Sequence, residues 1–394
     1  MPNPSPERGI LFVSHLATRN GAPIMLLHFL RWLRENGERP FSILVDDGTG
    51  GALLAEYAKV ADTWAADTSR WCPGGLRSQV LTAVGLGSWA KRAEKANVQR
   101  FALRDSPVLI YANSIAAPSA RLIEMLNPSI PVLTHVHELE HLLRVQAGEG
   151  LTATLARTRQ FIACSDAVKR NLVSAHNVAP ERIETIHECI PVSQTQAGRT
   201  REQVFQELGL PHDATLVMAG GGADWRKGSD LFIQLARVVC RQRPNVYFAW
   251  IGGGLVHELE HDARSVGLTP KMRFTGEVAK TIDYFAAADV FVLTSREDPY
   301  PLVCLEAAAV GKPIVCFAEA GGMPEFVEDD CGFVVPYLNT EAMADRVIRL
   351  LDCPRCREKM GAAARRKVAE RHDVSVAAPR IMEIIERTIQ DAGC

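Results

Sequence analysis

A glycine-rich segment with two adjacent cations is the first feature of the sequence that could do chemistry. Gly220 to Gly222 follow a run of strand length, and Arg226 and Lys227 precede a predicted helix that begins near Ser229. Glycines let the backbone approach a ligand closely, and cations beside a helix N-terminus suit a phosphate. The cluster therefore predicts a site for a diphosphate, although by itself it equally fits a flexible turn with two solvated cations.

A second segment places two carboxylates around the start of another predicted helix. Pro301 suits the first turn of a helix, so the helix should begin near it and run to about Val310. Asp298 then lies in the preceding loop and Glu306 one to two turns inside the helix. Two carboxylates can thus bracket a ligand whose phosphates rest on the free amides near Leu302. Taken alone, Glu306 is also compatible with an ordinary solvated helix residue.

The elements that must position these residues form two series of short apolar runs alternating with helical segments, which is typical of parallel sheets buried on both faces. The first series contains Gly9 to Ser14, Phe41 to Val45, Val108 to Ala112, Val132 to His135 and Phe161 to Cys164, with helices such as Ile24 to Glu35 and Val80 to Leu103. The second contains Thr215 to Ala219, Val246 to Ile251, Arg273 to Thr275, Val290 to Thr294, Ile314 to Phe317 and Gly332 to Val335. The fold class is therefore α/β, with two Rossmann-like doubly wound domains.

The domain boundaries follow from these two series. We expect an N-terminal Rossmann-like domain over 1–190, a polar linker over 191–200 and a C-terminal Rossmann-like domain over 201–375. Residues 376–394 end in the apolar stretch Ile381 to Ile389, which predicts a helix that can dock back onto the rest of the chain. In open α/β sheets ligands bind beyond the carboxyl ends of the strands, so the informative segments are the turns that follow them.

The segment Ser295 to Ala307 resembles the E-x7-E signature of the large family of retaining glycosyltransferases with the GT-B fold, known as family 4-like or group 1. The acid eight residues before Glu306 is Asp298, so the first Glu of the signature is replaced by Asp. The Lys-Gly pair at Lys227 and three further segments also fall where the family has them: Gly252 to Gly254, Phe274 to Val278 and Gly321 to Glu325. The resemblance spans most of the C-terminal domain.

The resemblance implies a role for each matching residue. Glu306 would hold the ribose hydroxyls of a nucleotide-sugar, Asp298 would contact the transferred sugar, and Lys227 would neutralise the diphosphate. Many family members have an Arg six residues before that Lys, where this chain has Gly221, and Arg226 is the candidate to compensate. The donor-binding residues expected from the resemblance are Gly221, Gly222, Arg226, Lys227, Gly276, Glu277, Tyr300, Leu302, Val303 and Glu306.

The N-terminal domain matches the family less closely. His137, after the run Val132 to His135, resembles the family histidine that reaches the donor sugar, so we expect it beside Asp298 and Lys227 among the catalytic residues. The turn after the first strand contains His15, Asn20 and Gly21, where relatives usually have adjacent glycines. We expect these three residues on the acceptor side of a cleft between the domains.

A competing motif occurs twice. His137 to His141 and His257 to His261 both satisfy H-E-x-x-H, which on a helix places two imidazoles one turn apart for zinc, with the Glu as general base. The first copy begins at a strand end, and the second lies in a charged stretch that indicates a solvated helix, so a zinc metallopeptidase is a remote alternative. A nicotinamide-dependent dehydrogenase is disfavoured because no G-x-G-x-x-G follows the first strand.

The amino-acid composition limits the classes of binding partner and the cellular locations that we expect for the protein. Lys plus Arg number 44 against 46 Asp plus Glu, so no net field favours nucleic acid. No stretch approaches the roughly 18 apolar residues of a spanning helix, so membrane contact would be peripheral at most, through basic segments such as Arg31 to Arg34. Ten cysteines, several in apolar runs, indicate reduced thiols, and the C-x-x-C pair Cys353 and Cys356 is interpreted as helix-packing thiols rather than a zinc or redox site. We expect a cytoplasmic protein, bound at most to the inner face of the membrane.

The resemblance therefore implies a retaining glycosyltransferase. It would move a sugar from UDP-, GDP- or another nucleoside diphosphate-sugar to a glycan, a lipid-linked acceptor or a small-molecule hydroxyl, in polysaccharide or glycoconjugate biosynthesis, with no cofactor and no metal. The alternative is a GT-B relative that binds or hydrolyses a sugar nucleotide without transfer, which the Asp298 and Gly221 departures leave open.

Overall fold

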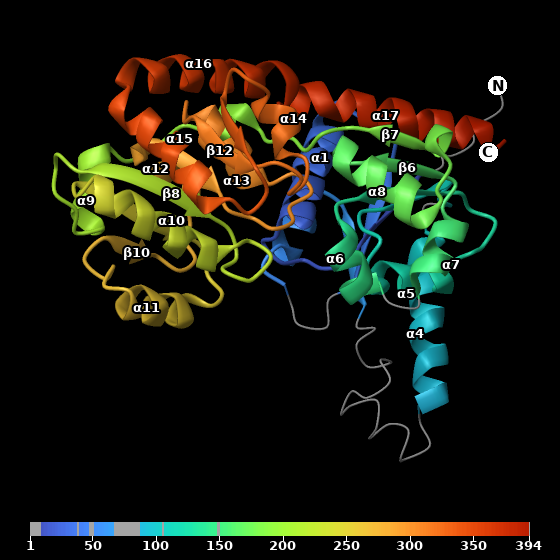
Figure 1. The fold of residues 1–394 in the computed structure, drawn as a ribbon. Helices are drawn as coiled ribbons and strands as arrows, with labels where there is room; N and C mark the ends of the chain where they lie inside the picture. Colours follow the sequence, from blue (N-terminus) through green and yellow to red (C-terminus); the bar gives the residue numbers. More distant parts are fainter. Residues whose placement is uncertain are drawn as a thin grey trace. The chain divides into compact units, whose positions relative to one another are not determined.

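The computed structural model describes residues 9–37, 39–46, 51–66, 87–104, 106–147 and 150–393. The chain divides into two compact units, each built around its own sheet (Figure 1). Unit 1 runs to Cys164 and also holds Val168–Ile186 and the C-terminal part from Ala377, whereas unit 2 holds Ser165–Ala167 and His187–Val376. No helix among the described residues combines the length and the apolar character needed to cross a membrane.

Unit 1 contains a parallel sheet of seven strands in the described residues, in the order β3-β2-β1-β4-β5-β6-β7. The strands are β1 (Ile10–Ser14), β2 (Phe41–Asp46), β3 (Asp62–Ala66), β4 (Leu109–Ala112), β5 (Val132–Val136), β6 (Gln160–Ala163) and β7 (Ile183–Thr185). The helices are α1 (Gly21–Asn36), α2 (Leu54–Tyr57), α4 (Gly87–Ala102), α5 (Ala117–Met125), α6 (Glu140–Leu142), η2 (Leu143–Ala147), α7 (Gly150–Arg157), α8 (Asp166–His176) and η3 (Pro180–Arg182).

Unit 2 contains a second parallel sheet, of six strands, in the order β10-β9-β8-β11-β12-β13. The strands are β8 (Thr215–Gly220), β9 (Val246–Ile251), β10 (Met272–Phe274), β11 (Val290–Leu293), β12 (Ile314–Phe317) and β13 (Gly332–Val335). The helices are η4 (Val192–Gln194), α9 (Arg201–Glu207), α10 (Ser229–Gln242), α11 (Val256–Ser265), α12 (Thr281–Ala287), α13 (Leu302–Ala309), α14 (Met323–Val327), α15 (Thr340–Asp352) and α16 (Pro354–Arg371). The last helix, α17 (Val374–Asp391), has its first three residues in unit 2 and the rest in unit 1.

Helices pack in two groups around the second sheet. Helix α10 packs against α11 and α15, whereas α12 packs against α9 and α13, and α13 against α16. Between α10 and the sheet, the ring of Phe232 lies edge-on to Phe248 and Trp250, each at a centroid distance of 5.5 Å. These buried rings hold the helix against β9, the strand beside β8 in the sheet.

The predicted α/β class with two doubly wound sheets is confirmed. All six strands predicted for the second domain are present, but β3 and β7 were not predicted. Both lie at edges of the first sheet, where one side of a strand has no neighbour, so their sequences need not be apolar runs. Of the helix predicted over 80–103, α4 accounts for the part from Gly87, and 80–86 lie outside the described residues.

The boundary between the units lies slightly before the predicted linker. It falls between Ile186 and His187, and residues 191–200 belong to unit 2, where Thr200 forms a capping box with Gln203 at the start of α9.

The C-terminal helix is present as α17, and from Ala377 on it belongs to unit 1. Arg39 donates to Glu386 from Nε at 2.6 Å and from Nη2 at 2.8 Å, which fixes this helix beside the start of β2.

One prediction about the cysteines is wrong. Cys353 and Cys356 were interpreted as packing thiols, yet they form a disulfide with a Cα separation of 5.2 Å. The physical reason is that Cys353 is the N-cap of α16 and Cys356 lies in its first turn, a spacing that brings the two sulfurs to the same side of the helix start.

Candidate functional site

The strand order of unit 2 locates its candidate site. The order runs outward in both directions from the pair β8 and β11, so the loops that follow these two strands diverge at a topological switch point, where α/β sheets bind ligands. The loop after β8 carries Arg226 and Lys227, and the loop after β11 carries Asp298. Lys227 and Asp298, which are 71 positions apart in the chain, therefore meet at the edge of the sheet formed by the carboxyl ends of its strands.

Lys227 and Asp298 are in direct contact. Lys227 donates from Nζ to Asp298 Oδ2 at 2.6 Å, and the Ser295 hydroxyl donates to the same oxygen at 3.1 Å. Arg226 lies farther off, with Nη1 at 3.9 Å from Asp298 Oδ1, and it donates to the carbonyl of Glu297 at 2.9 Å. Asp298 is only 4% exposed, so this carboxylate depends on the two cations and the hydroxyl for its stability.

Two glycines allow the site loops to approach the neighbouring backbone. Gly228, the N-cap of α10, has φ +64°, and a Cβ there would lie 1.9 Å from the carbonyl oxygen of Thr294. Gly321 has φ +140°, and a Cβ there would lie 1.8 Å from the carbonyl oxygen of Asp298. A larger residue at Gly228 would push the loop after β8 away from the end of β11, and one at Gly321 would push the loops after β11 and β12 apart. Both glycines therefore set the position of Asp298 relative to Lys227.

Helix α13 begins where the sequence predicted, with Pro301 as its N-cap and Leu302 as its first residue. Proline has no amide hydrogen, so the free donors at this helix start are the amides of Leu302 and Val303. One turn inside, Glu306 accepts a hydrogen bond from the Thr281 hydroxyl at 2.8 Å. Burial raises the pKa of Glu306 to about 7, with the Thr281 hydrogen bond acting in the opposite direction.

The turns after β9 and β10 complete this edge of the sheet. Gly252 donates to the carbonyl of Gly276 at 3.0 Å, and a Cβ on Gly252 would lie 2.2 Å from the carbonyl oxygen of Gly221. Glu277 is exposed and its side chain lies beside Gly253. Gly222 is also exposed, with open space where a Cβ would be. The predicted residues Gly221, Gly222, Gly276 and Glu277 thus border the same edge as Lys227 and Asp298.

Tyr300 takes a different place from the other predicted donor-binding residues. Its side chain is 4% exposed and stacks on His187 at a centroid distance of 4.8 Å. Its hydroxyl lies 3.3 Å from Nε2 of His372. Tyr300 therefore supports the start of α13 from within the core of unit 2.

In unit 1, the predicted residues His15 and His137 lie after the carboxyl ends of β1 and β5, on either side of Asn113, which was not predicted. Asn113, directly after β4, donates to the carbonyl of Ala22 at 2.9 Å, and its Oδ1 lies 3.2 Å from Nε2 of His137. His15, after β1, is buried with a pKa lowered to about 4, because burial disfavours its charged form and because protonated His137 would repel it. The switch point of this sheet lies between β1 and β4, so these residues also border a ligand-binding edge.

The remaining acceptor-side residues lie at the start of α1. Asn20 is the exposed N-cap of this helix, and Gly21 is its exposed first residue, with no atom within 4 Å of the position a Cβ would take. Beside His137, the Ser114 hydroxyl donates to the buried Glu138 carboxyl. Desolvation raises the pKa of Glu138, and its hydrogen bonds and His137 oppose this rise.

The two H-E-x-x-H copies differ in context. In the first, His137 follows β5 directly and α6 begins only at Glu140, so its two histidines do not share a helix, as the sequence indicated. In the second, the motif lies on α11, where His257 is almost fully exposed and its Nδ1 is 3.7 Å from Glu260. This copy lies on a solvated helix face, as its charged sequence indicated.

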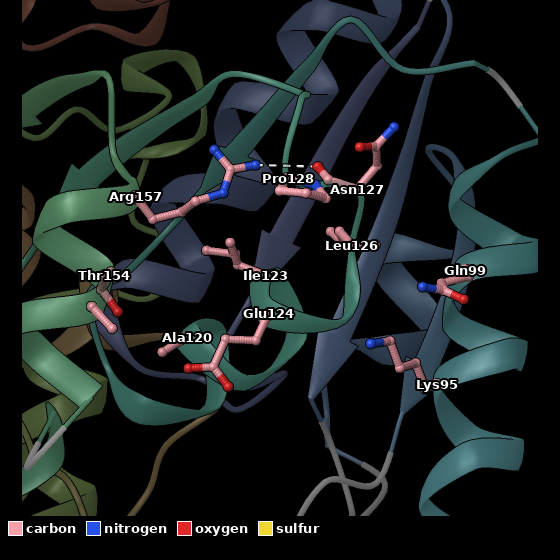
Figure 2. A pocket seen from close by; sticks show the side chains of 11 residues that line it. Lys95, Gln99, Ala120, Ile123, Glu124, Leu126, Asn127, Pro128, Thr154 and Arg157 are labelled. Atoms are coloured by element: carbon pink, nitrogen blue, oxygen red, sulfur yellow. Dashed lines mark hydrogen bonds between the residues drawn. The ribbon is translucent and has the colours of Figure 1, made fainter.

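A cavity of about 650 Å³ in unit 1 lies away from these residues (Figure 2). It is lined by helices α4, α5 and α7 and by the segment that leads into β5, including Leu126 and Pro128. Arg157 spans one side and donates to the carbonyl of Asn127 at 3.2 Å. Because Leu126 to Pro128 precede a strand, the cavity is at the amino-terminal side of the sheet and does not include the candidate site.

Sequence reasoning missed three residues of the unit 2 site. Ser295 and Thr281 donate to the two site carboxylates, but single hydroxyls have no distinctive spacing in a sequence. Trp225 is 57% exposed beside the two cations, and the Arg296 guanidinium lies 5.1 Å from its ring centroid. An exposed Trp directly before Arg226 was the one signal that could have identified this residue.

Comparisons with known proteins match both halves of the chain to glycosyltransferase families. The family described as "Glycosyl transferases group 1" matches residues 200–367, and "Glycosyltransferase Family 4" matches residues 19–194. The chain is 26% identical over 258 residues to D-inositol 3-phosphate glycosyltransferase from Thermobifida fusca, and 27% identical over 253 residues to the protein of that name from Kineococcus radiotolerans. These alignments span 59% and 58% of the relatives' own length.

Solved structures show the same fold. HepE from Anabaena, solved in complex with UDP and glucose, superposes with a TM-score of 0.77 at 20% identity over 96% of this chain and 100% of HepE. Sucrose-phosphate synthase from Thermosynechococcus elongatus superposes with a TM-score of 0.76 at 17% identity, over 98% of this chain and 100% of that one.

Proposed function

The chain belongs to the family 4-like glycosyltransferases of the GT-B fold, and from this membership we propose that it transfers a sugar from a nucleoside diphosphate-sugar to a hydroxyl acceptor with retention of configuration. The observation that carries the proposal is the contact of Lys227 with Asp298 at 2.6 Å, at the switch point of the second sheet. It joins a cation suited to a leaving diphosphate with a carboxylate suited to sugar hydroxyls.

Donor binding would redistribute the charges of this ion pair. A diphosphate carries more negative charge than one carboxylate, so it would compete with Asp298 for Lys227 and Arg226. The released Asp298 carboxylate would then accept hydrogen bonds from the hydroxyls of the transferred sugar. The ligand-free ion pair thus keeps both groups in place and neutralised until the donor arrives.

The remaining donor contacts would come from α13. The amides of Leu302 and Val303 point out of the helix start and suit the phosphate oxygens, while Glu306 suits the ribose hydroxyls. As the bond between the anomeric carbon and the phosphate oxygen breaks, negative charge builds on the diphosphate, where the two cations and the amides stabilise it. The acceptor oxygen bonds to the anomeric carbon from the same face, and its proton passes to a donor phosphate oxygen.

Positive charge in this proposal comes from side chains and amides, and no cofactor or metal ion is assigned a role. The donor class is supported by HepE, whose structures contain UDP, UDP with glucose and UDP-glucose. The acceptor class is supported by the matched relatives, which are named for D-inositol 3-phosphate. UDP-glucose with a phosphorylated polyol is therefore the first substrate pair to assay.

The test follows diphosphate release and product together. The purified protein is incubated with UDP-, GDP- and ADP-sugars, with and without polyol and sugar acceptors and with EDTA in parallel. Acceptor-dependent release with an α-linked product from an α-linked donor would support the proposal. Release that is the same without acceptor would instead favour the sugar-nucleotide hydrolase, and no release with any donor would count against both.

A further inference from the structure

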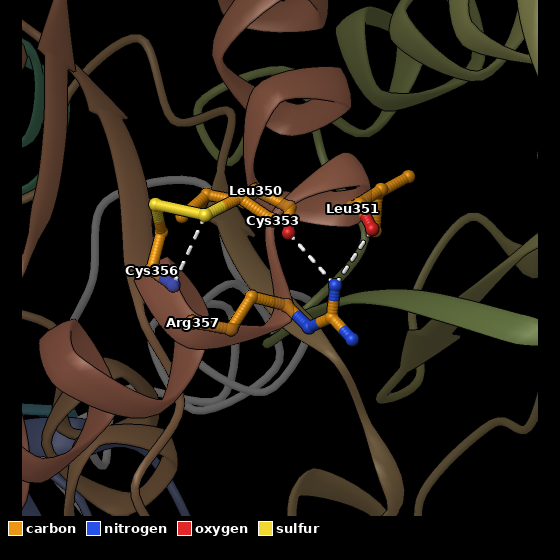
Figure 3. Close-up of a disulfide and its surroundings, with 5 residues drawn as sticks. All are labelled: Leu350, Leu351, Cys353, Cys356 and Arg357. Atoms are coloured by element: carbon orange, nitrogen blue, oxygen red, sulfur yellow. Dashed lines mark hydrogen bonds between the residues drawn. A yellow bond between two sulfur atoms is a disulfide. The ribbon is translucent and has the colours of Figure 1, made fainter.

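We propose that Cys353 and Cys356 form a reversible redox pair that exchanges two electrons with an external dithiol. The two residues are joined by a disulfide at the corner where α15 ends and α16 begins (Figure 3). The pair is independent of the proposed transferase function, because it takes no part in the site at the sheet edge.

The geometry distinguishes the two sulfurs. Cys353 is the N-cap of α16, and its Sγ accepts a hydrogen bond from the backbone amide of Cys356 at 3.2 Å. The helix has 18 residues and no acidic residue in its first turn, so its positive end is not neutralised there. Negative charge on the Cys353 sulfur is thus stabilised by an amide and by the helix start, which favours Cys353 as the exchanging sulfur and Cys356 as the resolving one.

Accessibility also separates this pair from most other cysteines in the described part of the chain. Both residues are half-buried, and Pro354 and Arg355 between them are exposed. Cys304 and Cys316 are fully buried, and burial raises the pKa of Cys316 to about 12. Cys240 is half-buried but has its pKa raised to about 11 by burial, so its thiol is a poor nucleophile at neutral pH.

The disulfide is poorly suited to a purely structural role. It closes a loop of only four residues, and the entropic stabilisation from a cross-link falls as the loop shortens. The corner has a second support, since Arg357 donates from Nη1 to the carbonyls of Leu350 at 2.8 Å and Leu351 at 2.7 Å. The helix corner can therefore persist when the disulfide opens.

Reduction of the Cys353–Cys356 disulfide by an external dithiol takes two steps. A thiolate of the dithiol attacks Cys353 Sγ, the bond between the two cysteine sulfurs breaks, and Cys356 leaves as a thiolate that takes up a proton. The second thiol of the reductant, as its thiolate, then attacks the reductant sulfur of the mixed disulfide, and Cys353 leaves as a thiolate that takes up a proton. Two electrons and two protons pass from the dithiol to the protein, and the reductant becomes a disulfide.

Peptide mapping tests the proposal on the full chain. The protein is equilibrated in native buffer with graded ratios of glutathione to glutathione disulfide, and in excess dithiothreitol, then alkylated and digested with trypsin. Cleavage after Arg355 separates the two cysteines when they are reduced and leaves the peptides cross-linked when they are oxidised. We expect reversible interconversion with a single midpoint and an unchanged far-UV circular dichroism spectrum.

Single variants test the roles of the two sulfurs. In C356S, Cys353 should form a mixed disulfide with glutathione and alkylate at pH 7 at least about tenfold faster than Cys240. In C353S, which keeps a hydroxyl at the N-cap and so preserves the helix start, Cys356 should react more slowly. A pair that never oxidises, one that resists dithiothreitol until the protein unfolds, or equal rates at Cys353 and Cys240 would each overturn the proposal.

Discussion

At the scale of single residues, the candidate site is defined by charge balance. One buried carboxylate, Asp298, is surrounded by Lys227, Arg226 and Ser295. The Glu306 carboxyl accepts a hydrogen bond from the Thr281 hydroxyl instead. The first carboxylate is stabilised by cations, while the second is shifted by burial toward its protonated form. Two acids with such different surroundings suit different tasks, one at the sugar and one at the ribose.

Replacing Lys227 with Ala should lower kcat by at least about tenfold, because the charge that develops on the leaving diphosphate loses its main stabilising cation. The measurement is steady-state release of nucleoside diphosphate with the best donor from the screen. K359A, which removes an exposed lysine from α16, is the matched control and should retain wild-type rates. Equal rates in K227A and K359A would refute the role of Lys227.

Nucleotide affinity should depend on the protonation of Glu306. Its pKa of about 7 means that the carboxyl is mostly protonated at pH 6 and ionised at pH 8, and only the ionised form accepts bonds from both ribose hydroxyls. Affinity should therefore rise with pH, by several-fold up to about tenfold between pH 6 and pH 8, since one pKa unit corresponds to about 1.4 kcal/mol. Calorimetric titration with the nucleoside diphosphate across this range measures the effect.

E306Q is the control for the Glu306 prediction. A terminal phosphate of the ligand also titrates near pH 6, and the Gln variant retains that contribution while lacking the carboxyl. We expect E306Q to bind more weakly at pH 8 and to show only the residual slope of the ligand. If wild type and E306Q gave the same slope and the same affinity, Glu306 would not contact the nucleotide.

At the scale of elements, the site depends on how closely loops approach the backbone of neighbouring strands. Gly228 allows the start of α10 to lie against the end of β11, and Gly321 allows the loop after β12 to pair with Asp298. Because each loop packs against the backbone of its neighbour, these contacts fix the distance between Lys227 and Asp298. The glycines are therefore positioning residues for the ion pair.

G228A should destabilise unit 2 and reduce turnover together. A Cβ there would lie 1.9 Å from the Thr294 carbonyl oxygen, and φ is +64°, so strain and a backbone clash combine. G209A is a close control, because Gly209 has φ +60° but no atom within 4 Å of its would-be Cβ. By chemical denaturation we expect G228A to lose about 1–3 kcal/mol more than G209A, in the usual range for overpacking. Equal losses would show that the α10 start can shift without cost.

At the scale of the whole molecule, a ligand screen decides between the remaining functions. Binding to the native state raises the melting temperature, so the full chain should be stabilised by one of UDP, GDP or ADP, with little effect of NAD or zinc. The melting temperature is measured with each ligand, and the metal content is measured on the same sample. Stabilisation by zinc together with stoichiometric bound metal would favour the H-E-x-x-H alternative, and no shift with any nucleotide would count against a sugar-nucleotide enzyme.

The sequence by itself determined the class of fold and marked the loops that form the candidate site. Buried parallel strands must be apolar on both faces, so the inner strands of the second sheet, β8, β9, β11 and β12, were visible as apolar runs. Strands β3 and β7 were not, because edge positions relax that requirement. Pro301 marked the start of α13, and the spacing of Asp298 and Glu306 around it marked the site, since these signals are local in the chain.

Only the tertiary structure decided which distant residues meet. The contact of Lys227 with Asp298 and the hydrogen bond from Thr281 to Glu306 depend on strand order, which no local pattern encodes. The burial of Tyr300 and the raised pKa of Glu306 depend on which residues pack around these side chains, and that packing is decided by the tertiary structure. The disulfide of Cys353 was likewise hidden, because C-x-x-C spacing brings two sulfurs together in only some backbone conformations, here at the start of α16.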